Sequence, residues 1–127
     1  IKLDVTNIKN VQTSIANAFK EFGRIDVVVN NDGYGLIGAI EETSDEEAKQ
    51  QFETNFFGAL NVTREVLPIL REQKSGHIVN ISSLAGFSAF PSFGIYSATK
   101  FALEGISEAL AGEVAPHGIK TTLIDLG

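Results

Sequence analysis

The sequence predicts an α/β fold built on a parallel sheet. Hydrophobic periodicity alternates along the chain between amphipathic helical stretches and short runs of continuously apolar residues. The apolar runs at 25–29, 76–81 and 119–124 are separated by segments long enough to hold a crossover helix, which is how parallel strands are connected. The order βαβαβ therefore predicts parallel strands joined by right-handed crossovers.

The first half of the chain supplies two helices and one strand. Residues 11–22 carry apolar side chains at helical spacing, and Gly23 ends the pattern. The β-branched run 25–29 is typical of a strand buried on both faces. A glycine-rich loop follows, and a capping-box pattern at 44–47 opens a helix that continues over 46–71. Pro68 indicates an irregularity in the final turn of that helix.

The second half repeats the alternation. A strand is predicted at 76–81, a helix at 94–113 and a strand at 119–124, with Pro116 and Gly118 before the last strand. In open parallel sheets, ligands bind at the carboxyl ends of the strands. Asn30, Ser83 and Gly127 fall at such ends, so we expect the loops there to meet in one crevice.

Composition indicates a single globular domain over residues 1–127. Apolar residues make up 43% and charged residues 20% of the 127 residues, and no internal repeat or linker-like stretch occurs. A net charge of −6 argues against nucleic acid or an anionic membrane as a partner, and no apolar run reaches the roughly 18 residues that span a bilayer. The chain has no cysteine, which excludes disulfides and agrees with a cytoplasmic location. His77 and His117 stand alone, so no metal site is predicted.

Tyr96, Lys100 and Ser83 are the residues that point to chemistry. Tyr96 and Lys100 lie four residues apart in a predicted helix, so they share one face. A neighbouring cation favours the phenolate and brings the tyrosine closer to a pKa at which it can transfer a proton. The Ser83 hydroxyl could bind the carbonyl or alcohol oxygen to or from which the tyrosine transfers its proton. The alternative is an ordinary amphipathic surface pair.

Five motifs give the chain a resemblance to a known family. They are Leu-Asp-Val-Thr at 3–6, Asn-Asn-Asp-Gly at 30–33, Asn55, Asn-Ile-Ser-Ser at 80–83 and Tyr-Ser-Ala-Thr-Lys at 96–100. In this order and spacing they resemble the short-chain dehydrogenases/reductases along essentially the whole chain. The resemblance implies a partial NAD(P)-binding, Rossmann-like domain, which is a doubly wound parallel sheet in a three-layer α/β/α arrangement.

The resemblance also implies a hydride transfer between NAD or NADP and a carbonyl or secondary alcohol. Tyr96 would be the general acid or base, and Lys100 would lower the pKa of its phenol and hydrogen-bond the nicotinamide ribose. Ser83 would hold and polarise the substrate oxygen. Asn55 would interrupt its helix and hold a water molecule that extends a proton relay from Lys100.

Further residues would bind the cofactor by the same resemblance. Asn30 would fix the turn after its strand, and Gly33 would let the backbone approach the cofactor. Asp4 would accept a hydrogen bond from the adenine amino group while Val5 packs on the ring, although Asp4 could equally be an ordinary turn aspartate. The sequence does not decide between NAD and NADP, because that choice depends on a strand expected before residue 1.

The loop between Ser83 and Tyr96 is rich in large apolar residues. Leu84, Phe87, Phe90 and Phe93 lie within it. Such a loop beside the proposed serine predicts a pocket for a small hydrophobic ketone, aldehyde or alcohol. A loop packed onto the core is an equally good interpretation.

Three departures from the family pattern leave two other functions open. The glycine-rich turn that holds the pyrophosphate does not occur, Asp32 replaces an alanine, and Leu126 replaces a proline. The alternatives are a family-like protein that binds a dinucleotide or a partner without catalysis, and a structural or interaction module.

We expect the chain to be a piece of a longer protein. About two strands and two helices would precede it by the resemblance, and without them the strand 25–29 is a bare apolar edge. The isolated piece is therefore expected to be marginally stable or aggregated, and not to bind a dinucleotide tightly. The helices 46–71 and 94–113 resemble those that build homodimers and homotetramers in the family.

Overall fold

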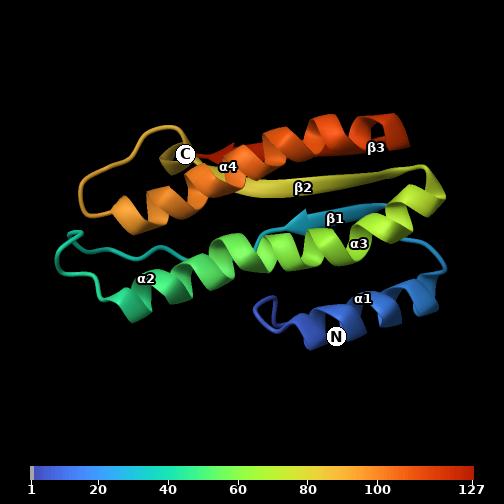
Figure 1. Ribbon diagram of the computed structural model, residues 1–127, viewed down its shortest axis with the longest axis horizontal. Coiled ribbons are helices and arrows are strands. Elements are labelled where there is room, and N and C mark those ends of the chain that lie inside the picture. The colour runs from blue at the N-terminus through green and yellow to red at the C-terminus, as the bar shows by residue number, and fades with distance from the viewer. Residues whose placement is uncertain (1) are drawn as a thin grey trace.

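Three strands form one parallel sheet in the order of the sequence. The computed structural model describes residues 2–127, in which β1 (Val27–Asn30), β2 (Gly76–Ser83) and β3 (Ile119–Leu126) lie side by side (Figure 1). All strand pairs are parallel, with Asn30 opposite Asn80 and Ser83 opposite Leu126. The predicted parallel α/β fold is confirmed.

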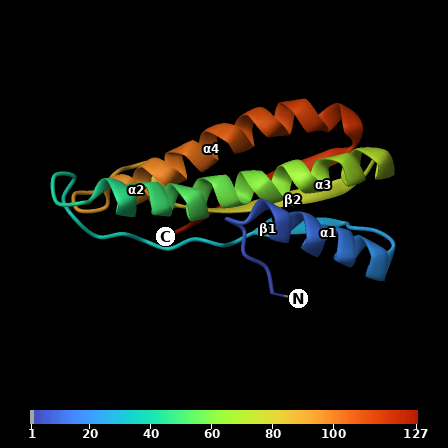
Figure 2. The ribbon, with the colours of Figure 1, turned by 60° about the horizontal axis from the view of Figure 1, so that its bottom comes forward.

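Helices α3 (Ala59–Gln73) and α4 (Gly94–Val114) cover one face of this sheet. Helix α3 lies between α4 and α1 (Ile8–Phe22), as Figure 2 shows. The strands alternate accordingly: side chains directed at the helices are buried, whereas Val27 and Val29 on the opposite face are 57% and 54% exposed. Two of the three predicted layers are thus seen in residues 2–127, and the third remains an expectation.

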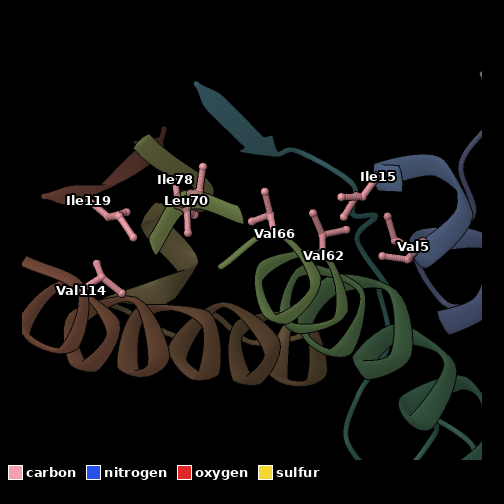
Figure 3. Close-up of a cluster of buried hydrophobic side chains, with 9 residues drawn as sticks. Val5, Ile15, Val62, Val66, Leu70, Ile78, Val114 and Ile119 are labelled. Atoms are coloured by element: carbon pink, nitrogen blue, oxygen red, sulfur yellow. The ribbon is translucent and has the colours of Figure 1, made fainter. Parts of the chain in front are cut away.

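The hydrophobic core lies between the helices and the sheet. Leu70 and Ile78 are fully buried and pack with apolar residues from α1, α4 and β3 (Figure 3). The cluster consists of Val5, Val11, Ile15, Val62, Val66, Leu70, Ile78, Val114 and Ile119. This core fixes α3 and α4 on the sheet and so determines where the ends of the strands meet the helices.

Two elements start at different residues than predicted because side chains bind the backbone near their ends. Helix α1 begins at Ile8, three residues earlier, since the Asn7 side chain accepts a hydrogen bond from the Asn10 N–H at 3.0 Å and caps the helix. β1 begins at Val27, because the Gln73 amide bonds both the N–H and the C=O of Ile25. Ile25 therefore lies outside the sheet ladder.

The predicted helix 46–71 is divided by a π-helical turn. Helix α2 (Asp45–Phe52) starts with the predicted capping box between Ser44 and Glu47, and a π-helical turn over Glu53–Gly58 connects it to α3. A π-helical turn inserts one extra residue into the helix, and such turns are frequent at functional sites. Pro68 lies inside α3, which continues past it to Gln73.

Gly58 is required at the end of this turn because the first loop of the chain packs on it. A Cβ added there would lie 2.5 Å from Val5 Cγ2. Gly58→Ala in the complete protein should lower the free energy of unfolding by about 1–3 kcal/mol, measured by urea denaturation, because the core must shift to admit the methyl group. Gly112→Ala on α4 is the control: nothing lies within 4 Å of its added Cβ, so it should be neutral or slightly stabilising. Equal effects of the two substitutions would contradict this packing argument.

Candidate active site

The carboxyl ends of the strands meet the start of α4 around one cavity. This cavity has a volume of about 330 Å³. Gly33 lines it from the loop after β1, Ser83 from the end of β2, and Tyr96 and Lys100 from the first turns of α4. The structure thus brings together the three side chains that the sequence singled out.

Lys100 is buried and fixed to the sheet. Only 6% of the residue is exposed, and its Nζ donates a hydrogen bond to the Ile81 carbonyl oxygen at 2.9 Å. The same Nζ lies 5.7 Å from the centre of the Tyr96 ring. Burial lowers the pKa of Lys100, and the Glu104 carboxylate partly opposes this effect. The Lys100 side chain is thus held beside the phenol of Tyr96.

Ser83 presents a hydroxyl to the cavity. It is the last residue of β2, and its Oγ accepts a hydrogen bond from the Ala85 N–H at 3.2 Å. Because the oxygen acts as the acceptor in that bond, its O–H hydrogen can be donated to another oxygen atom. Ser82, its neighbour, is 2% exposed and packs beneath the site.

Asn55 lies in the π-helical turn and clamps the loop after β1. Its Oδ1 accepts from the Tyr34 N–H at 3.0 Å, and its Nδ2 donates to the Tyr34 carbonyl at 2.9 Å and to Thr99 Oγ1 at 3.1 Å. A Cβ on Gly33 would lie 3.2 Å from Asn55 Oδ1, so a larger residue there would require the Asn55 side chain to shift by a few tenths of an ångström. The helix is interrupted at the expected residue, whereas the water expected on Asn55 remains a proposal.

The Asn30 side chain forms hydrogen bonds within the protein interior. Its Nδ2 donates to Asn80 Oδ1 at 2.7 Å and to Thr63 Oγ1 at 3.2 Å, while the Asn80 amide donates to Ser107 Oγ at 2.7 Å. This buried network joins β1, β2, α3 and α4. The Asn30 side chain thus ties the strand to its neighbours, and the backbone that follows it forms the turn.

Asp4 and Val5 lie apart from this cavity. The Asp4 carboxylate accepts hydrogen bonds from the Thr6 hydroxyl at 2.7 Å and the Thr6 N–H at 3.0 Å, which hold the pKa of Asp4 below its usual range. Asp4 borders a different, polar cavity beside α2. Val5 packs in the core against Gly58, so its side chain offers little surface to an adenine ring.

Two residues of the site were not found from the sequence. Gln51 is fully buried, and its Nε2 donates to the Tyr34 carbonyl at 2.9 Å alongside Asn55. Thr99 Oγ1 donates to the Tyr96 carbonyl at 2.6 Å while it accepts from Asn55. Only their positions in the sequence could have pointed to these two residues. Gln51 precedes Asn55 by one helical turn, and Thr99 directly precedes Lys100.

An apolar pocket adjoins the first cavity. It has a volume of about 430 Å³ and is lined by Leu84, Phe90, Phe93, Tyr96 and other residues of the loop before α4. The Phe93 ring meets the Tyr96 ring edge to face, with centroids 6.4 Å apart. Leu84, Phe87 and Phe90 are 52%, 62% and 47% exposed, so this loop lines a pocket and is not packed onto the core.

The described residues contain neither a group of three metal-ligating side chains nor a helix that could cross a membrane. Within residues 2–127, no three histidine, aspartate or glutamate side chains gather in a way that could hold a metal ion. His77 Nε2 lies 2.7 Å from Thr122 Oγ1 on the neighbouring strand. In the same part of the chain, no helix combines the length and the apolar character needed to cross a bilayer.

The chain belongs to the short-chain dehydrogenase family. The family's sequence model, described as short chain dehydrogenase, matches residues 1–127. A 3-ketodihydrosphingosine reductase of Bacteroides thetaiotaomicron is 47% identical over 125 residues, which cover 98% of this chain and 46% of that protein. The chain spans about half the length of the curated relatives it matches.

Solved structures agree with this assignment and with the fold. The structure of ElxO with NADP bound is 36% identical with a TM-score of 0.96, and the alignment covers 98% of this chain and 51% of that one. A short-chain dehydrogenase/reductase from Burkholderia phymatum in complex with NAD is 32% identical with a TM-score of 0.94, covering 98% and 46%. The Rossmann-like fold is thereby confirmed.

Thr99→Val tests the link between Asn55 and the backbone of Tyr96. Valine has nearly the same shape but can neither accept from Asn55 nor donate to the Tyr96 carbonyl, so the complete protein should lose about 1–3 kcal/mol of unfolding free energy. Urea denaturation measures this loss. Thr13→Val, on the exposed face of α1, is the matched control and should change stability by less than about 0.5 kcal/mol. If both variants unfold at the same urea concentration, these hydrogen bonds contribute nothing to stability.

Proposed function

We propose that the complete protein is an NAD(P)-dependent oxidoreductase that transfers a hydride between the cofactor and a carbonyl or secondary alcohol. The observation that carries this proposal is the convergence of Tyr96, Lys100 and Ser83 on one cavity at the carboxyl edge of the sheet. Proton transfer at a carbonyl oxygen needs an acid of suitable pKa and a donor that holds the oxygen.

Each side chain has a distinct task in this proposal. In the direction of reduction, the Tyr96 hydroxyl gives its proton to the carbonyl oxygen, and in oxidation the phenolate removes the proton from the alcohol. Lys100, fixed by the Ile81 carbonyl, stabilises the phenolate that reduction leaves behind. Ser83 donates its hydroxyl hydrogen to the substrate oxygen and stabilises the charge that develops there. Asn55 acts by holding the loop that carries Gly33.

The proposed cofactor is NAD or NADP, which supplies or accepts the hydride when bound. Two related structures hold these dinucleotides, one with NADP and one with NAD. The cavity fits such a group because Tyr96 and Lys100 line it beside Gly33 at the carboxyl edge of the sheet, where open parallel sheets bind their ligands. We assign Lys100 and Tyr96 to the nicotinamide end of the cofactor. Asn30 supports the turn after β1 through its buried hydrogen bonds. Asp4 is assigned to the adenine end, where the carboxylate oxygen that does not bond Thr6 would accept a hydrogen bond.

The proposed substrate is small and hydrophobic. The apolar pocket shares Ser83 and Tyr96 with the first cavity, so a substrate whose oxygen faces these residues extends its apolar part toward Phe90 and Leu84. The relative from Bacteroides thetaiotaomicron is named for the reduction of a ketone, 3-ketodihydrosphingosine, which supports a carbonyl group as the reacting part of the substrate.

We further propose a cytoplasmic homodimer or homotetramer. Phe57 on the π-helical turn and Phe101 on α4 are 41% and 46% exposed, and both elements belong to the helices expected to form interfaces between subunits. Zero cysteines and the net charge of −6 agree with a cytoplasmic location and with partners other than nucleic acid.

Tyr96→Phe is the decisive test of catalysis. Phenylalanine retains the ring and its contact with Phe93 but has no proton to transfer, so kcat for a panel of hydrophobic ketones should fall by about 10²–10⁴-fold. Oxidation of NADH and NADPH at 340 nm measures the rate, and fluorescence titration should show unchanged cofactor affinity. Cofactor binding by the wild type without any turnover that depends on Tyr96 would favour the non-catalytic alternative.

Phe90→Ala tests the apolar pocket. The substitution removes a large part of its wall while leaving Tyr96 and Ser83 in place, so KM for a hydrophobic ketone should rise about tenfold or more with a smaller change in kcat. Ser88→Ala, in the exposed part of the same loop, is the control and should leave KM unchanged. An unchanged KM in Phe90→Ala would place the substrate elsewhere.

A further inference from the structure

The loop before α4 ends in a turn that has a serine where glycine is usual. The Phe93 N–H donates to the Phe90 carbonyl oxygen at 3.0 Å, which closes a four-residue turn with Pro91 in its second position. Ser92 occupies the third position with φ at 67°, in the left-handed region. This is the pattern of a type II turn, whose third residue is ordinarily glycine or asparagine because a side chain is strained there. Ser92 thus holds a backbone conformation that its own Cβ disfavours.

The loop after β1 contacts this turn and stabilises the strained conformation. Gly38 donates its N–H to the Ser92 carbonyl oxygen at 2.9 Å, and the two loops lie side by side at the N-terminal ends of α2 and α4 (Figures 1 and 2). A second contact lies close by, because a Cβ on Gly94 would be 3.2 Å from Ile40 Cγ1. A residue in the left-handed region persists where its surroundings enforce that conformation. We call the hydrogen bond between Gly38 and Ser92 the clasp.

The loop after β1 is itself fixed on both sides of Gly38. Before it, the Tyr34 N–H and carbonyl are both bonded by the Asn55 side chain. After it, the Ala39 carbonyl oxygen accepts from the Thr43 N–H and from Thr43 Oγ1, each at 3.1 Å. The Gly38 N–H is therefore a donor at a fixed position, and the turn before α4 must bring its carbonyl to that position.

The same turn forms a wall of the apolar pocket. Three of its four residues, Phe90, Pro91 and Phe93, line that pocket together with Tyr96. The Phe93 ring also meets the Tyr96 ring edge to face. The turn thus has the pocket on one side and the loop after β1 on the other, so the conformation of Ser92 determines where the two phenylalanines stand.

We propose that Ser92 is a specificity-determining residue whose left-handed backbone, held by the clasp, sets the width of the apolar pocket. The inference rests on the proposed function, which assigns this pocket to the apolar part of the substrate. The backbone of Ser92 performs this task, and its hydroxyl has no part in it. A residue that leaves the left-handed region turns its carbonyl away from Gly38, so the clasp opens and the wall of the pocket is no longer fixed.

The variants Ser92→Gly and Ser92→Val separate the backbone conformation from the hydroxyl. Both remove the hydroxyl, but glycine adopts a positive φ freely whereas a β-branched residue is a genuine outlier there. In the complete protein, we compare kcat/KM for a linear methyl ketone with kcat/KM for the much wider adamantyl methyl ketone. The ratio of the two should fall about tenfold in Ser92→Val and stay within about twofold of the wild type in Ser92→Gly.

Ser88→Val is the matched control for this comparison. Ser88 is an exposed serine of the same loop and does not adopt a left-handed conformation, so the same substitution there should leave the ratio unchanged.

Hydrogen exchange at the Gly38 amide provides a readout that does not depend on activity. An amide held in a stable hydrogen bond exchanges slowly, and local opening accelerates the exchange. The Gly38 amide should exchange about tenfold faster in Ser92→Val than in the wild type, Ser88→Val or Ser92→Gly. Mass spectrometry with single-residue resolution measures these rates. Equal rates in the wild type and Ser92→Val would overturn the clasp.

The kinetic results can also overturn the inference. Equal loss of discrimination in Ser92→Gly and Ser92→Val would show that the hydroxyl matters, and a wild type that accepts both ketones equally well would show that the wall sets no width. If Ser92→Val does not fold, Ser92→Ala replaces it with an expected change of about threefold in each measurement, because alanine has a Cβ but no branch. Failure of the proposed function is distinguishable, since no ketone would then be reduced in a way that depends on Tyr96. The exchange rate of the Gly38 amide tests the clasp in either case.

Discussion

The hydrogen bond between the buried Lys100 ammonium and the Ile81 carbonyl is the constraint on which the site depends. It joins the first turns of α4 to the end of β2, and so sets the distance between the helix that carries Tyr96 and the strand that carries Ser83. A buried ammonium is costly unless it is hydrogen-bonded, so the contact must form for α4 to pack at this position. The same contact that orders the fold therefore leaves a cation beside a phenol.

The molecule uses different forces at the two ends of the sheet. Near the start of β2, Ile78 packs in an apolar cluster with α3 and α4, which supplies stability but little directional information. Toward the carboxyl end, Asn80 and Asn30 face the same helices and are paired with each other and with Ser107. Buried polar groups must be satisfied with correct geometry, so this network specifies the register and orientation that the cavity needs.

The sequence predicts the order of elements well because hydrophobic periodicity is local. It predicts their ends less well, since these depend on side chains from distant parts of the chain, as Gln73 shows by bonding the backbone of Ile25. Tyr96 and Lys100 are visible because they are close in the sequence, and the interruption at Asn55 was predicted from the family resemblance. Gln51 was not predicted because it donates a hydrogen bond to a loop carbonyl 17 residues away in the sequence, and no local sequence pattern indicates such a contact.

The alternation of side chains along β2 connects the cavity to the residues that pack behind it. Ser83 contributes to the cavity, whereas its neighbour Ser82 projects to the opposite face of the strand, toward α4 and Glu104. Because one planar peptide unit joins Ser82 to Ser83, a displacement of the end of β2 toward or away from α4 moves both residues. Lys100 adds a second connection, since it bonds the carbonyl of the residue before Ser82. The Ser83 hydroxyl, which the proposed function directs at a substrate oxygen, is thus held from behind by contacts of Lys100 and Ser82.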